Sequence, residues 1–197
     1  ISSFPEPNGK MELSELDRWI LKEINDIAQF AKERYESYDF HNPAAKIKHF
    51  IWESFASHYL ELVKNRAYNE NKQFSQEQQN GTLFTLKYCL DILLKLLAPV
   101  IPFITYKLYQ DLNSKDIHFE EFPKNDPKYA KYKQKFSSEE LAALNSFIWK
   151  AKKDKQLSLK ADVSELVLIE RLKEAEKDFI AAHHAVKVSY SEIADVR

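Results

Sequence analysis

The sequence predicts a mainly α protein, an up-and-down helical bundle followed by a small α+β domain at the C-terminal end. Three observations support this prediction. Apolar residues recur at helical spacing before residue 122, the 197 residues include only two glycines, and two short β-branched or aromatic runs follow residue 160. With 44% hydrophobic residues, the chain can bury a substantial core.

The first two helices are expected to be antiparallel. The first spans residues 14–37, and Ser14 with Asp17 forms a capping-box-like start. The second begins at Asn42 and Pro43 and runs to about residue 68, because asparagine favours the N-cap and proline the first helical position. The residues before Ser14 hold two prolines and a glycine, so they are expected to form a loop.

Residues 50–68 carry an unusually aromatic inner face. Phe50, Phe55 and Tyr59 fall on one side at helical spacing. We interpret them, together with Trp52, as scaffold, because large rings bury the most area per residue. The stretch then ends in two cations, an amide and an aromatic ring, namely Lys64, Asn65, Arg66 and Tyr68. This basic end has the clearest functional interest.

Two more helices complete the expected bundle. The third covers residues 83–98, and Ser75 could cap an earlier first turn. It must end just before Pro99, because proline disfavours helical geometry in the residue that precedes it. Pro102 then opens a fourth helix over residues 103–112, whose inner side is expected to carry Ile104, Leu108 and Leu112.

We expect three regions along the chain. Residues 1–122 form the helical bundle, residues 123–136 a basic linker and residues 137–197 a small C-terminal domain. The end of the bundle, residues 117–122, is expected to be extended. The linker holds five lysines against one acid and has no apolar period.

The C-terminal domain is expected to begin with a helix that Ser137 and Glu140 cap. Its end carries several lysines, including Lys150, Lys152 and Lys153, and cations there also suit the helix dipole. Two strands at residues 165–169 and 186–190, separated by a helix over residues 171–182, then predict a small β-α-β unit.

Composition limits the function classes. The net charge is −1, with 14 Lys+Arg against 18 Asp+Glu in residues 1–122 and 15 against 12 in residues 123–197, so a nucleic-acid role needs a local patch. Cys89 is the only cysteine, which excludes an internal disulfide and a multi-cysteine zinc site and fits a reducing cytosol. The longest apolar run, residues 93–104, is too short and too broken to span a bilayer.

The residues do not suggest a catalytic or metal-binding constellation. The six histidines do not form an HExxH motif, and the adjacent His183 and His184 would point to different faces of a helix. Gly9 and Gly81 are too far apart for a phosphate-cradling loop. Cys89 lies in an apolar helix, where it is expected to be a small buried hydrophobe. We therefore expect no catalytic residue, no metal and no cofactor in this chain.

Four segments together resemble a known family. They are LDRWIL (16–21), the Tyr-x-Phe turn (38–40), FIWESFASHYLELVK (50–64) and LLAPVIPFITYKLY (96–109). In order and spacing they resemble the anticodon-binding helical domain of class Ia aminoacyl-tRNA synthetases. The Trp-x-x-Phe-x-x-x-Tyr-x-Glu pattern at residues 52–61 is similar to the valine-specific members, and residues 137–197 look like the small C-terminal region of the archaeal type.

The resemblance implies a tRNA-binding fragment of a larger ligase. The full-length enzymes of the family use ATP and Mg²⁺ to attach valine to its tRNA, but their HIGH and KMSKS signatures are missing from this sequence. The implied partners are valine tRNA and the catalytic and editing domains of the same protein, and no activity is expected from this chain alone. The resemblance also implies a cytoplasmic monomer without membrane contact.

The same resemblance implies where tRNA binds. The residues expected to contact the anticodon loop are Lys64, Asn65, Arg66 and Tyr68, with a guanidinium plane or a phosphate contact where the methionine relatives stack a tryptophan. Contact with the tRNA stem or elbow would suit Lys150, Lys152 and Lys153, although a solvated helix end explains them equally well. Two alternatives remain open: the same domain of an isoleucine or leucine enzyme, and a non-catalytic helical module for protein interaction.

Overall fold

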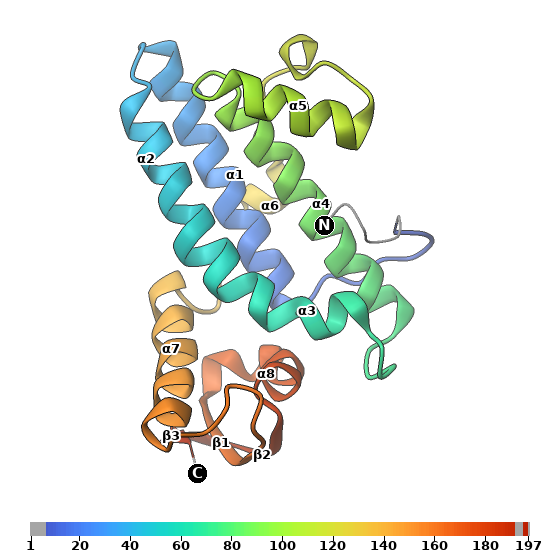
Figure 1. Cartoon of the computed structure of the whole chain (residues 1–197), viewed down its shortest axis with the longest axis vertical. Coiled ribbons are helices and arrows are strands. Elements are labelled where there is room, and N and C mark those ends of the chain that lie inside the picture. The colour runs from blue at the N-terminus through green and yellow to red at the C-terminus, as the bar shows by residue number, and fades with distance from the viewer. Residues whose placement is uncertain (1–6, 192–194, 197) are drawn as a thin grey trace.

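The computed structural model describes residues 7–191 and 195–196 of the chain. Long helices run side by side in its N-terminal part: α1 (Glu15–Glu36), then the continuous run of α2 (His41–His49), η1 (Phe50–Leu60) and α3 (Glu61–Tyr68), then α4 (Gln76–Leu97) (Figure 1). The shorter α5 (Pro102–Asn113) crosses one end of this bundle, and the C-terminal unit lies at the other. The predicted helical bundle with a small α+β unit is confirmed.

Local capping signals fix three helix starts as the sequence predicts. The expected N-cap at Asn42 is wrong, because α2 begins at His41, after Phe40, with no side-chain cap. Each of three helices begins with a complete capping box, in which a serine hydroxyl and the side chain three residues later accept each other's backbone N–H groups. The pairs are Ser14 with Asp17 in α1, Ser75 with Gln78 in α4, and Ser137 with Glu140 in α7 (Ser138–Asp154). Because Ser75 caps α4, that helix starts seven residues before the apolar stripe that predicted it.

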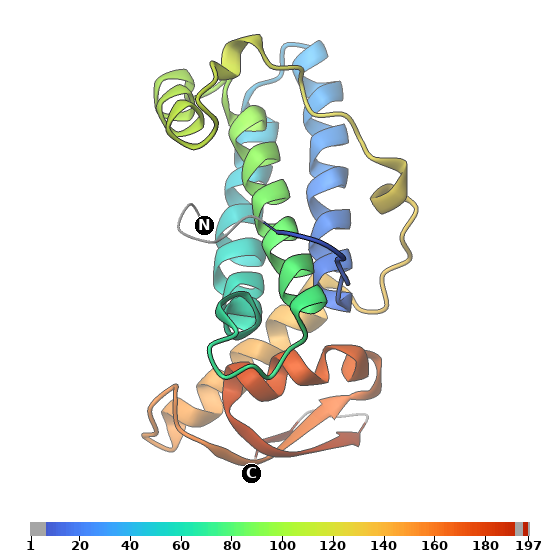
Figure 2. The same ribbon diagram turned by 90° about the vertical axis from the view of Figure 1, so that its right-hand side faces the viewer.

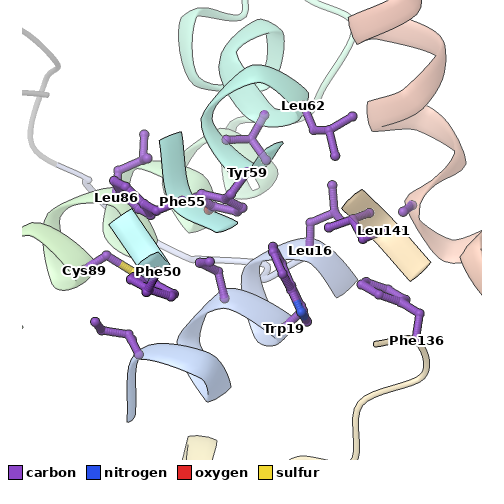
Figure 3. Close-up of a cluster of buried hydrophobic side chains, with 14 of the residues drawn as sticks. Leu16, Trp19, Phe50, Phe55, Tyr59, Leu62, Leu86, Cys89, Phe136 and Leu141 are labelled. Atoms are coloured by element: carbon purple, nitrogen blue, oxygen red, sulfur yellow. The ribbon is translucent and has the colours of Figure 1, made fainter. Parts of the chain in front are cut away.

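The inner face of the second helix is aromatic, as expected, and lies in the bundle core (Figure 3). Phe50, Phe55 and Tyr59 are buried and stack in a row, with ring centroids 6.1 Å and 5.8 Å apart. Trp19 from α1 is also buried, and its indole N–H donates to the Ser138 hydroxyl at 3.1 Å. Stacked rings add to the free energy of burying their area, so this row holds α1, η1 and α4 together.

The interpretation of Trp52 as scaffold is wrong, because its side chain is 69% exposed. The second helix is a π-helix over Phe50–Leu60, and its hydrogen bonds span five residues instead of four. This wider turn aligns Phe50, Phe55 and Tyr59 toward the core, since they are spaced by five and four residues. Trp52 is left on the opposite, solvent-facing side.

The expected inner face of the fourth helix is also wrong. The exposed fractions of Ile104, Leu108 and Leu112 are 56%, 45% and 38%, whereas Thr105 and Tyr109 are buried. Tyr109 packs with Leu94 and Ile117 in a small separate cluster at the end of the bundle. Helix α5 therefore packs on the bundle through Thr105 and Tyr109, and about half of the surface of its aliphatic stripe stays exposed. The segment after α5 forms a 3₁₀ turn, η2 (Ile117–Phe119), and not the extended piece expected.

Residues 123–136, expected as a basic linker, pack along the bundle (Figure 2). They contain the short helix α6 (Pro127–Ala130), whose Tyr129 is buried beside Tyr88 at a ring-centroid distance of 5.5 Å. The Asp126 N–H donates to the Asn25 side-chain oxygen at 2.9 Å, and Phe136 lies against Trp19. Two aromatic side chains therefore attach this segment to α1 and α4.

The C-terminal unit contains the predicted β-α-β arrangement. Strand β1 (Val163–Ile169) leads through η3 (Glu170–Ala175) and α8 (Glu176–His183) to β2 (Ala185–Ser191), which pairs with β1 in parallel. A third strand, β3 (Asp195–Val196), adds to the other edge of β1 in antiparallel direction and was not predicted. Helix α8 lies between the sheet and the bundle, as Figure 2 shows, so it joins the two parts.

Candidate nucleic-acid interface

A groove of about 870 Å³ opens where the bundle meets the C-terminal unit. One wall is a single stripe along η1 and α3, formed by Trp52, Ala56, Ser57, Glu61, Lys64, Asn65 and Tyr68. The other wall comes from the end of α7, the loop after it and the end of α8, through Trp149, Leu159, Lys160, Ala182 and His184. The lining is therefore aromatic and aliphatic, with cations at intervals.

Three of the residues expected at the anticodon lie in this groove. The Lys64 side chain is half-exposed and pairs with Glu61 at 2.5 Å. The Asn65 side-chain amide donates to the Ala181 carbonyl at 2.5 Å, so it ties α3 to α8 at the base of the groove. Tyr68 is 58% exposed at the end of α3. These positions are compatible with the RNA contacts expected of them.

Arg66 is the exception, because its side chain is only 1% exposed. Its guanidinium donates to both oxygens of Asp17 on α1, at 2.7 Å and 3.1 Å, and its Nε lies 3.0 Å from a carboxylate oxygen of Asp178 on α8. The Tyr59 hydroxyl also donates to Asp17, at 2.6 Å. We therefore correct the expectation for Arg66: it joins three helices in the interior and is not accessible to RNA.

The opposite charges of Arg66, Asp17 and Asp178 stabilise one another in the interior. Burial disfavours the charged guanidinium, but the two nearby carboxylates outweigh burial and raise the pKa of Arg66. Burial raises the pKa of Asp178 to about 6, against the lowering effect of Arg66. Planar bidentate pairing of this kind is specific to arginine, so the cluster fixes how α8 docks on α3.

Lys152 is likewise buried, at 1% exposure. Its ammonium donates to three backbone carbonyls, those of Leu159, Ala161 and His183, at 2.8–2.9 Å. An ammonium has three donors, and all three are used here. Lys152 therefore holds the loop that forms one wall of the groove, and the expected contact with tRNA does not fit its burial. Lys150 and Lys153, by contrast, are exposed on α7.

A second buried polar chain crosses the same junction. The His183 Nε2 lies 2.7 Å from the Asn145 side-chain oxygen, and the Asn145 amide lies 3.1 Å from His58 Nδ1. Asparagine accepts through its oxygen and donates through its nitrogen, so this network needs the N–H on Nε2 of His183 and a neutral His58. Burial lowers the pKa of both rings, that of His183 to about 3. The network thus joins α8, α7 and η1.

The described part of the chain holds no group of three His, Cys, Asp or Glu side chains that could bind a metal ion. Cys89 is buried in α4, as expected, and burial raises the pKa of its thiol. None of the helices in the described ranges has the length and apolar character needed to cross a membrane. The groove is the feature of these residues best suited to a ligand, and its lining suits stacking and charge contacts more than acid-base chemistry.

Comparison with known proteins shows the family of the chain. Residues 17–168, most of the chain, match the family described as the anticodon-binding domain of tRNA ligase. The chain belongs to this family. The matched segment of this anticodon-binding domain includes the bundle, α7 and β1, so both walls of the groove lie largely within it.

Individual relatives are valine–tRNA ligases, and three of them come from archaea. The chain is 34% identical to that of Pyrobaculum aerophilum over 184 residues, which is 93% of this chain and 23% of the relative. It is 28% identical to the Archaeoglobus fulgidus protein over 98% of its own length, and 29% identical to the Aeropyrum pernix protein over 97%. These alignments span 22% and 24% of the two relatives. The chain therefore corresponds to less than a quarter of each of these relatives.

Proposed function

We propose that this chain is the anticodon-recognition part of a valine–tRNA ligase, and that it binds valine tRNA in the groove. The match of residues 17–168 to a family of anticodon-binding domains carries the proposal. The names of the archaeal relatives support valine over isoleucine or leucine. The family match also favours tRNA binding over the alternative of a protein-interaction module.

The chemistry of the groove supports this proposal. Unpaired loop bases offer faces for stacking and edges for hydrogen bonding, while their phosphates attract cations. Tyr68 offers an exposed ring at the end of α3, and Lys64 offers an ammonium one turn before it. The exposed Lys150 and Lys153 on α7 would meet the phosphates of the adjoining stem. In this proposal Arg66 and Lys152 keep the groove in shape.

We place the catalytic and editing steps in the rest of such a ligase, where ATP and Mg²⁺ would be bound. This chain lacks the glycine-rich loop that cradles phosphates. The division into a bundle over residues 1–122, a connecting segment over 123–136 and a C-terminal domain over 137–197 is part of the proposal. We further propose that the ligase is cytoplasmic, in line with the single cysteine here, and that it acts as a monomer.

A binding experiment tests the proposal. The chain of residues 1–197 is titrated against valine tRNA and against the same tRNA with a replaced anticodon, at low and moderate salt. We expect tighter binding to the natural anticodon and an affinity that falls linearly with the logarithm of the salt concentration. Equal affinity for both tRNAs would contradict the proposal that the chain recognises the anticodon. The absence of a gel shift with either tRNA would favour the protein-interaction alternative.

A pair of lysine variants locates the contact. Lys64→Ala should weaken tRNA binding. It should also reduce the slope of log binding constant against log salt concentration by about 1, as expected for one lost phosphate contact. Lys107→Ala is the matched control, because Lys107 also sits in an exposed intrahelical ion pair, with Asp111 at 2.7 Å, but on α5 at the far end of the bundle. An equal effect of the two substitutions would contradict a local contact in the groove.

A further inference from the structure

Trp52 is exposed in a way that core packing does not explain. It occupies a helix whose neighbouring rings Phe50 and Phe55 are buried, yet 69% of its own surface faces solvent. Leaving an indole in water forgoes the favourable free energy of burying a large apolar surface. Trp52 lines the groove together with Trp149, so its exposed face belongs to a hollow and not to a flat surface.

The backbone holds this tryptophan in a defined place. The π-helix that carries it is a rare conformation, and π turns occur frequently at functional sites. The Ser57 hydroxyl donates to the Trp52 carbonyl at 2.7 Å, which satisfies a carbonyl in the widened turn. Across the groove, the Trp149 ring stacks on the buried His58 at a centroid distance of 5.9 Å. Both indoles are therefore attached to well-packed parts of the fold.

The size and charge of the groove indicate one kind of occupant. Trp52 and Tyr68 are separated by 16 residues of one helical run, and its α-helical part, Glu61–Tyr68, alone spans roughly 12 Å at about 1.5 Å per residue. A stacked nucleotide advances by about 3.4 Å, so the stripe can accommodate several unpaired nucleotides. Lys64 and Lys160 line the groove against a single acid, Glu61, which favours an anionic chain. Aromatic faces alternating with cations are the usual lining of single-stranded nucleic-acid sites.

We propose that the groove binds a single-stranded RNA segment with one unpaired base stacked on the indole of Trp52. Lys64, 12 residues further along the same helical run, then faces the phosphate of another nucleotide of the segment, and Lys160 faces the segment from the opposite wall. This inference rests on the proposed function and deepens it, because it assigns a base contact to a residue that the sequence had indicated as scaffold. It also extends the contact surface from the end of α3 along η1 to the C-terminal unit.

Two substitutions test the base contact by affinity. Trp52→Ala should weaken binding of a hairpin carrying the anticodon loop of valine tRNA by about 5- to 150-fold, the usual effect of losing one base stack. Trp52→Phe should retain much of the affinity, because a smaller aromatic face remains. Phe103→Ala is the matched control, since Phe103 is an 89% exposed ring on α5, far from the groove, and its loss should leave the affinity unchanged.

Tryptophan fluorescence and binding of an RNA duplex distinguish a base stacked on Trp52 from other ways of binding the hairpin. The hairpin should quench tryptophan emission of the wild-type chain, and most of this quenching should vanish in Trp52→Phe. A fully paired RNA duplex should bind more weakly than the hairpin. If the wild type binds the hairpin but Trp52→Ala binds it equally well, or if the duplex binds as tightly, this inference is overturned while the proposed function stands. If the wild type binds neither RNA, both fail.

Discussion

Removing the guanidinium of Arg66 should destabilise the fold far more than removing a surface charge from the same helix. Arg66→Met keeps a long side chain of similar volume but leaves Asp17 and Asp178 buried without their cation. The Asp17 carboxylate in the first turn of α1 would then keep only its hydrogen bonds from the Ser14 N–H and the Tyr59 hydroxyl. The change therefore affects α1, α3 and α8 together.

The expected magnitude follows from the burial of the cluster. Arg66 and both carboxylates have side-chain exposures of 4% or less, so water cannot replace the lost cation. Breaking such a buried pair by removing one partner costs about 3–5 kcal/mol of unfolding free energy. Lys64→Met, the matched control two residues earlier, breaks a half-exposed pair with Glu61 and should cost about 0–1 kcal/mol.

Urea unfolding followed by circular dichroism at pH 7 measures both variants. Because protonation relieves an unpaired buried carboxylate, the deficit of Arg66→Met should shrink as the pH is lowered toward 5. Asp178, whose pKa burial already raises to about 6, is the group expected to take up the proton. If Arg66→Met matches Lys64→Met in stability at pH 7, the buried cluster does not hold the two parts together.

Two further predictions concern the junction and the leading loop. Burial lowers the pKa of His183 from 6.5 to about 3, so the unfolded chain binds a proton at this residue more readily than the folded chain does. The stabilisation by neutral His183 is therefore complete above pH 6.5 and is lost as the pH falls toward 3. Between pH 6.5 and 5, the free energy of unfolding measured with urea should fall by up to about 2 kcal/mol more in the wild type than in His183→Gln. Parallel pH profiles of the two proteins would refute this prediction. A Cβ at Gly81 would lie 2.1 Å from the Glu12 carbonyl oxygen, so Gly81→Ala should cost about 1–3 kcal/mol although alanine favours helices. An unchanged or raised melting temperature of Gly81→Ala would contradict this prediction, because the loop around Glu12 would then move aside without a cost in stability.

Features that depend on a few neighbouring residues could be predicted from the sequence. The capping boxes at Ser14, Ser75 and Ser137 are satisfied within three residues, so the local pattern determines them. The β-α-β unit also follows from local composition, since strand-length β-branched runs alternate with a helix. The third strand is only two residues long, and such a short strand leaves little periodic signal.

The buried cations could not be assigned correctly from charge alone. Arg66 follows Leu62 and Val63 at helical spacing, and Lys152 follows Ile148, so both lie on the apolar stripes of their helices. That position was the available signal for burial. The partners of Arg66, however, lie on α1 and α8, far away in sequence, and periodicity says nothing about them.

Two misplaced faces have different physical causes. The exposure of Trp52 results from the π-helix, because a hydrophobic pattern is normally interpreted with the α-helical period. The stripe of Ile104 and Leu108 on α5 has the correct period, but it is 56% and 45% exposed, while the neighbouring Thr105 and Tyr109 are buried. Periodicity identifies an apolar face without identifying what covers it.

Chemical footprinting of valine tRNA bound to the chain of residues 1–197 tests the central claim most directly. The account predicts protection of the unpaired anticodon-loop nucleotides, with weaker protection along the adjoining stem near Lys150 and Lys153. The protection in the loop should decrease in Trp52→Ala and Lys64→Ala and persist in Phe103→Ala. Protection confined to the acceptor stem, or spread evenly over the tRNA, would contradict the assignment of the groove to the anticodon loop.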